Sequence, residues 1–156
     1  MGARINFVFK DDLNSAVVLY SHWGETEWRR DLAMALEHAK PRWTDNSYAT
    51  RMIISYLMQD SVLEETGFGI FSISGPNYDL GDTTVIVDLI NHTVIDDQGN
   101  AVGWDVFVLA YAPVLIDSNG TLSILLQNCS PSLSRGLLRG RRLISLTCAP
   151  NTFLIQ

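Results

Sequence analysis

Cysteine and histidine are scarce in this chain, and their spacing excludes several kinds of site. The two cysteines, Cys129 and Cys148, lack the paired spacing of metal ligands, so neither a zinc motif nor a disulfide framework is expected. The three histidines, His22, His38 and His92, are too far apart along the chain for a local metal site. The sequence therefore predicts no metal and no cofactor.

Long apolar runs are also missing. No stretch of about 18 uncharged apolar residues is present that could span a membrane. Residues 1–6 lack the apolar core of a signal peptide. We therefore expect a cytoplasmic protein with no membrane partner.

Signatures of known catalytic sites do not occur either. The chain has no phosphate-binding glycine loop, no His-Glu-x-x-His helix and no nucleophile elbow. We predict no catalytic residue, and a binding protein is expected rather than an enzyme.

Acidic residues are absent from the last quarter of the chain. Residues 1–117 carry seven Lys/Arg and all 17 Asp/Glu, a balance of −10, whereas residues 118–156 carry four arginines and no acid. An acidic body argues against duplex DNA as a partner, because binding phosphates requires clustered cations. We expect one α+β domain over 1–117, followed by a basic C-terminal extension over 118–156.

Hydrophobic patterning predicts two strands and then two helices. Residues 4–10 alternate apolar and polar side chains, and residues 16–21 form the return strand of a hairpin. Apolar residues recur at helical spacing from Trp28 to Ala39, with Thr26 as the N-cap and Pro41 ending the helix. A second helix is expected from Asn46 or Ser47 to Gln59.

Four further strands are expected over 67–74, 84–90, 93–96 and 102–111. The order β-β-α-α-β-β-β-β predicts an antiparallel sheet with two helices packed on one face. Residues 114–126 resemble a further hairpin with its turn at Asn119-Gly120.

The first predicted strand pair leads into a stretch that resembles a ligand pocket. His22, Trp23 and Gly24 stand where the second strand ends, and Arg29 lies in the first turn of the helix. A helix start has unpaired N–H groups and partial positive charge, so it can receive an anion. Trp23 could stack on a ring while His22 donates a hydrogen bond. Alternatively, Trp23 fills the corner of the core and His22 caps a carbonyl.

Arginine and aromatic residues alternate around the connection between the two helices. Arg42, Trp43, Tyr48 and Arg51 combine guanidinium forks, which bind phosphate bidentately, with rings that could hold a base or sugar. The alternative is that these arginines are solvated and pair with nearby acids on the surface.

Several segments resemble those of uncharacterised small bacteriophage and bacterial proteins that share a Tyr-Ser-His-Trp-Gly motif. The segments that carry this resemblance are residues 4–9, 19–24, 42–43, 47–51 and 65–70. The resemblance implies a phage-type accessory protein, located in the host cytoplasm if it is phage-encoded, and supplies no catalytic residues.

Together these features predict a protein that sequesters a small anionic, nucleotide-like ligand, such as a signal of bacterial immunity. Because sequestering proteins often build sites between subunits, a homo-oligomer is expected. Two alternatives stay open. One is a hydrolase acting on such a ligand with His22 as acid/base, and the other is a structural accessory or inhibitor that binds a protein partner.

Overall fold

The computed structural model describes residues 4–12, 14–22, 24–75, 78, 80–116 and 122–124. Two compact units make up the chain, Met1–Ala112 and Pro113–Gln156. The elements of the first unit are β1 (Ile5–Lys10), β2 (Ser15–Ser21), α1 (Trp28–Ala39), the 3-10 turn η1 (Lys40–Arg42), α2 (Asn46–Leu57), β3 (Phe68–Ser74), β4 (Thr83–Asp88), β5 (Thr93–Ile95), β6 (Ala101–Gly103) and α3 (Trp104–Tyr111). The described elements of the second unit are β7 (Val114–Ile116) and β8 (Leu122–Ile124).

The predicted α+β class is confirmed, but the sheet is mixed rather than antiparallel. Its strand order is β3-β2-β1-β4-β5-β6. β1 pairs in parallel with β4, with Phe7 opposite Val85, whereas the other pairs of neighbouring strands are antiparallel. β3 runs in the same direction as β1, because each is antiparallel to β2. β4 also runs in this direction, so the chain between β3 and β4 must return to the end of the sheet at which β3 starts.

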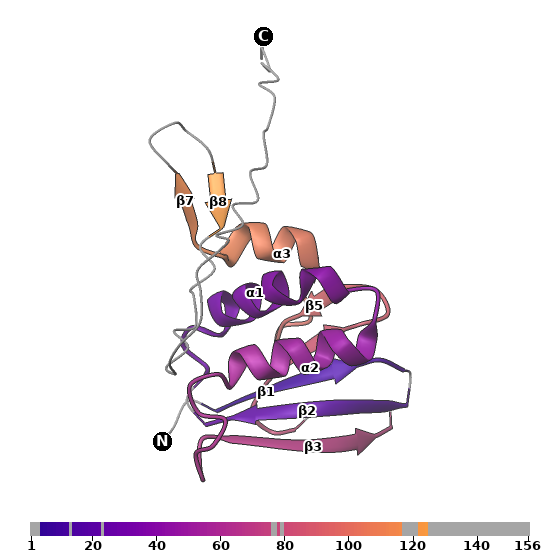
Figure 1. Ribbon diagram of the computed structural model, residues 1–156. Coiled ribbons are helices and arrows are strands. Elements are labelled where there is room, and N and C mark those ends of the chain that lie inside the picture. Colours follow the sequence, from indigo (N-terminus) through magenta and orange to yellow (C-terminus); the bar gives the residue numbers. More distant parts are fainter. Residues whose placement is uncertain are drawn as a thin grey trace. The chain divides into compact units, whose positions relative to one another are not determined.

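That return crosses one face of the sheet. Tyr78 and Leu80, from the crossing segment, pack on a small cluster of Val8, Ala16 and Val18. On the opposite side of the sheet, α1 and α2 run side by side, as Figure 1 shows, and a third helix that was not predicted, α3, packs against α1. The sheet is therefore covered on both faces near its centre.

The main core lies between the helices and the strand residues that face them. Side chains of β1 and β4 alternate, and Ile5, Phe7 and Phe9 point to the same face as Val85 and Val87. All five are at most 2% exposed. Leu32 and Leu36 of α1 are fully buried at helical spacing and complete this core.

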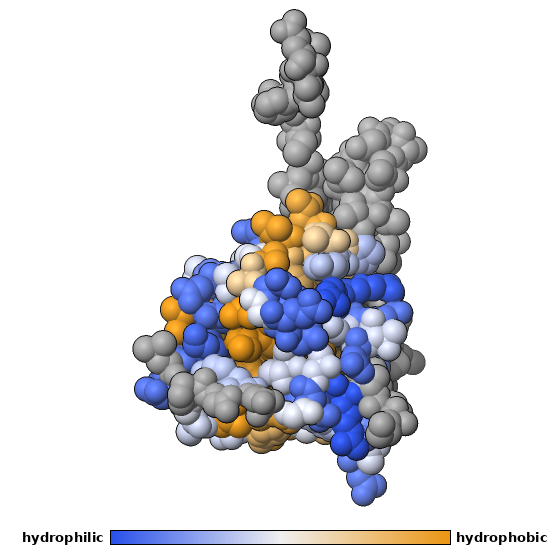
Figure 2. Space-filling view, turned by 180° about the vertical axis from the view of Figure 1, so that it is seen from behind, coloured by the Kyte–Doolittle hydropathy of each residue, from blue (hydrophilic) through white to orange (hydrophobic). Residues whose placement is uncertain are grey.

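The predicted strand over 102–111 is wrong for most of its length. Only Ala101–Gly103 is a strand, and α3 follows directly. Trp104, Phe107 and Val108 are buried at helical spacing, whereas Val106 and Leu109 are 62% and 72% exposed. Nearly every residue of this run is apolar, so the helical period is masked in the sequence. Figure 2 shows the resulting exposed apolar surface over α3.

Smaller differences concern element ends. The N-cap of α1 is Glu27 rather than Thr26, and α2 ends at Leu57 rather than Gln59. In the second unit, β7 pairs antiparallel with β8, as the predicted hairpin requires. The predicted turn at Asn119-Gly120 and nearly all of the predicted extension, residues 118–156, lie outside the described residues.

Candidate functional site

The residues predicted to bind a ligand fall at two opposite ends of α1. His22 and Gly24 precede the helix and Arg29 lies in its first turn. The other four, Arg42, Trp43, Tyr48 and Arg51, follow its last turn. Twelve helical residues span about 18 Å, so the two groups do not form one pocket. Trp23 lies outside the described residues.

His22 and Gly24 have clear structural contacts. The His22 Nδ1 atom lies 2.9 Å from the Tyr20 hydroxyl, and the His22 N–H donates to the Gly67 carbonyl at 2.9 Å. A Cβ on Gly24 would lie 2.8 Å from Ile5 Cγ2 and 3.0 Å from the Ser21 hydroxyl. Only glycine fits this approach without a shift of its neighbours, so Gly24 sets the path of the chain into α1.

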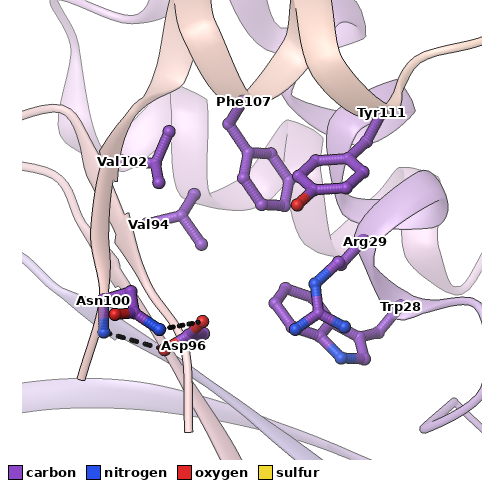
Figure 3. A pocket seen from close by; sticks show the side chains of 8 residues that line it. All are labelled: Trp28, Arg29, Val94, Asp96, Asn100, Val102, Phe107 and Tyr111. Atoms are coloured by element: carbon purple, nitrogen blue, oxygen red, sulfur yellow. Dashed lines mark hydrogen bonds between the residues drawn. The ribbon is translucent and has the colours of Figure 1, made fainter. Parts of the chain in front are cut away.

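Arg29 borders a small pocket that sequence reasoning did not find. Figure 3 shows the lining residues, which come from α1, α3 and the β5–β6 hairpin: Trp28, Arg29, Val94, Asp96, Asn100, Val102, Phe107 and Tyr111. Its cavity volume is about 30 Å³, far below the roughly 300–1,000 Å³ of usual ligand sites. Its lining depends on α3, which the sequence pattern predicted as a strand.

Most groups that line this pocket are already engaged. The Trp28 ring stacks on Phe107, with centroids 6.0 Å apart, and the Arg29 guanidinium lies 4.3 Å from the Trp28 centroid. Asp96 accepts hydrogen bonds from the Asn100 side chain at 3.0 Å and from the N–H groups of Gln98 and Asn100. The pKa of Asp96 lies below its usual value, chiefly because the Asn100 side chain donates a hydrogen bond to the carboxylate. The side chains that line the pocket therefore mainly hold α1, α3 and the β5–β6 hairpin together.

Arg42, Tyr48 and Arg51 meet on the surface and form what we call the Arg–Tyr cluster. The Tyr48 side chain, in the first turn of α2, is 52% exposed. The Arg42 and Arg51 guanidinium carbons lie 5.3 Å and 5.9 Å from the centroid of its ring. Both arginines are exposed. The structure thus brings together three of the predicted residues, with two arginines beside the ring of one tyrosine.

Backbone hydrogen bonds hold the cluster in place. The Asp45 N–H donates to the Arg42 carbonyl at 2.9 Å, which closes the turn between α1 and α2. The Asp45 carboxylate accepts the Tyr48 N–H at 3.3 Å and so caps α2. These bonds therefore hold the backbone of Arg42 and of Tyr48 in place.

Trp43, the fourth residue of this group, anchors the turn to the core. Its indole N–H donates to the Leu36 carbonyl at 2.9 Å, and its carbonyl lies 3.0 Å from His92 Nε2. The ring packs edge-on against Trp104, with centroids 5.2 Å apart. Trp43 is thus a support for Arg42, and a role in stacking on a ligand stays a prediction.

Within the described part of the chain, the two arginines of the cluster have no ion-pair partner. Among the described residues, no carboxylate oxygen lies within 4.0 Å of either guanidinium, whereas Arg30 pairs with Glu27 at 3.7 Å. Lys40 next to the cluster pairs with Glu37 and Asp105. Exposed guanidinium groups that no described carboxylate neutralises are suited to bind an anion.

Over the described part of the chain, no group of three His, Cys, Asp or Glu side chains is placed to hold a metal ion. Within the same residues, no helix has the length and apolar character needed to cross a membrane.

Comparison with protein-family models, with curated proteins and with solved structures found no match to this chain. The chemistry of the Arg–Tyr cluster therefore has to be inferred from its own residues.

Proposed function

We propose that this chain binds a small anionic, nucleotide-like ligand at the Arg–Tyr cluster and acts by sequestering it. The observation behind this proposal is that two exposed guanidinium groups, which pair with no carboxylate among the described residues, lie beside a half-exposed tyrosine ring. The sequestering role is proposed because the resemblance implies a phage-type accessory protein and supplies no catalytic residues.

Electrostatics favours an anion at this place. Two like charges held near one ring repel each other, and an anion bound beside them would reduce that repulsion while accepting hydrogen bonds from a guanidinium fork. The arginine planes and the exposed part of the Tyr48 ring offer surfaces on which a base can stack. His22, Gly24 and Arg29, at the other end of α1, are not part of this site.

Calorimetric titration with a panel of ADP, a cyclic dinucleotide and pyrophosphate tests the proposal. Arg42→Ala and Arg51→Ala should each weaken binding about 10- to 100-fold, because a hydrogen bond to a charged group contributes roughly 1.5–3 kcal/mol. Arg30→Ala is the matched control. It removes the same charge from an exposed position that is paired with Glu27, and should change binding less than about 2-fold.

Arg51→Lys shows how much of the binding depends on the positive charge of Arg51 and how much on its planar guanidinium group. It keeps the positive charge but loses the planar fork, so its affinity should lie between those of the wild type and Arg51→Ala. Equal affinity of Arg42→Ala, Arg51→Ala and Arg30→Ala would refute the cluster as the binding site, and so would no binding by any member of the panel.

The hydrolase alternative makes a different prediction for the same ligand. The hydrogen bond between His22 and Tyr20 fixes the imidazole, which a general acid/base would require. If the protein only sequesters, ligand recovered after denaturing the complex is intact. Loss of ligand over time that disappears in His22→Ala would instead establish turnover.

A further inference from the structure

The edge strand β3 carries a row of backbone hydrogen-bonding groups that no strand in the described part of the chain pairs with. The His22 N–H donates to the Gly67 carbonyl and the Gly75 N–H donates to the Asn14 carbonyl, at the two ends of the β2–β3 ladder. The register between these ends is continuous. Because hydrogen-bonded pairs alternate along an antiparallel ladder, Gly69, Phe71 and Ile73 direct their N–H and C=O groups toward β2.

The remaining residues of β3 direct theirs away from the sheet. These residues are Phe68, Ile70, Ser72 and Ser74, and β3 is the outermost strand of its sheet among the described residues. Sheet edges are usually protected by charges, proline, a bulge or a very short strand. β3 has seven residues without charge or proline, and it pairs with β2 without a bulge.

Apolar side chains are exposed on both faces of this strand. Ile70 is 55% exposed on the face that the helices cover, and Phe71 is 43% exposed on the opposite face. The opposite sheet edge, β6, has only three residues, and α3 follows it directly. β3 is therefore the longer of the two sheet edges and exposes two large apolar side chains.

We propose that β3 pairs antiparallel with β3 of a second copy of this chain, joining two sheets across a two-fold axis at Phe71. In this register Ile70 lies opposite Ser72 of the partner copy, so the outward N–H and C=O groups of all four residues find partners. The two Phe71 rings then face each other in a non-hydrogen-bonded pair, where cross-strand side chains are closest.

The absence of charge on β3 allows it to pair with a second copy. The body of the protein is acidic, with a balance of −10 over residues 1–117, but no charged side chain occurs between Phe68 and Ser74. Self-pairing at β3 thus places no like charges opposite each other within the paired strands. The two-fold axis is perpendicular to the sheet, so the helices of both copies lie on the same face. This inference does not depend on the ligand proposed for the Arg–Tyr cluster.

Sedimentation velocity on the full chain over a range of concentrations tests the pairing. The wild type should form a dimer. Ser72→Pro should be monomeric at the same concentrations, because proline removes an outward N–H while leaving the β2–β3 ladder intact. Ser72→Ala, the matched control, keeps the N–H and should remain dimeric. A wild type that is monomeric throughout, or a dimer that survives Ser72→Pro, would overturn the proposal.

Disulfide trapping provides a second test, which does not require that the proline variant folds. In a chain with Cys129→Ser and Cys148→Ser, Phe71→Cys should oxidise to a covalent dimer, because paired Cα atoms about 4.5 Å apart can form a disulfide. Ile70→Cys should not, since it faces Ser72 of the partner copy. Linkage at Ile70 but not at Phe71 would overturn this register. A monomer whose β3 edge amides resist hydrogen exchange would overturn the dimer and assign the edge to another segment of the chain.

Discussion

Asp88 is a buried carboxylate that hydrogen bonds hold in its charged form at the end of β4. Its side chain is 3% exposed and accepts a hydrogen bond from Lys10 Nζ at 3.2 Å. It also accepts the N–H groups of Ile90 and Asn91, both at 2.9 Å, and the Asn91 side chain at 3.0 Å. Burial raises the pKa of Asp88, but these bonds outweigh burial and hold the pKa below its usual value.

Asp88→Asn should lower the free energy of unfolding by about 2–3 kcal/mol at pH 7, because the amide loses the charge that Lys10 and the N–H donors stabilise. A pKa lowered on folding stabilises the chain above the ordinary value of about 3.9, and this contribution is lost as pH falls through the folded pKa. Urea unfolding of the two proteins from pH 7 to pH 3 should therefore show their difference shrinking at the acid end. A difference that stays constant would contradict the role of the ionised carboxylate.

Asp105→Asn is the matched control for this prediction. Its side chain is 78% exposed and lies 3.6 Å from Lys40, so solvent screens the pair. The free energy of unfolding should change by less than about 0.5 kcal/mol.

Elements whose pattern is local could be predicted from the sequence, and elements decided by distant contacts could not. β1 shows alternating side chains, and α1 has a clear apolar stripe ended by Pro41, so both were found close to their true bounds. α3 lacks a polar face because Val106 and Leu109 remain exposed on a helix that buries Trp104. This segment is a helix because it packs against α1, and a contact with a distant element does not appear in the local sequence pattern.

The N-terminus of α2 links stability to the proposed binding site. Asp45 caps the helix and also brings a negative charge next to the Arg–Tyr cluster. Asp45→Asn should keep the cap, since asparagine is an equally good N-cap, and should tighten binding of the anion a few-fold by removing that charge. Asp45→Ala should lose about 1 kcal/mol of stability. Thermal melts and calorimetric titration of both variants test this, and weaker anion binding by Asp45→Asn would contradict it.

At the scale of the whole molecule, the candidate site was predictable only where its residues are close in sequence. Arg42, Tyr48 and Arg51 lie within ten residues around one short turn, so their meeting followed from the predicted helix pair. Arg29 lies instead in a pocket built partly from α3, which the sequence pattern predicted as a strand. The parallel pairing of β1 with β4 was likewise missed, because it depends on where the segment after β3 crosses the sheet.

Every buried residue of the described core lies between Ile5 and Ala112, within the first unit. Removing residues 130–156 should therefore leave a cooperative melting transition, with a midpoint within a few degrees of that of the full chain, because the cut removes none of this core. Calorimetry of the truncated protein, with light scattering to detect association, measures both properties. The exposed Val106 and Leu109 of α3 make the result informative, because an unprotected apolar face promotes association. Aggregation of the truncated protein would contradict the prediction and show that the C-terminal segment completes the fold.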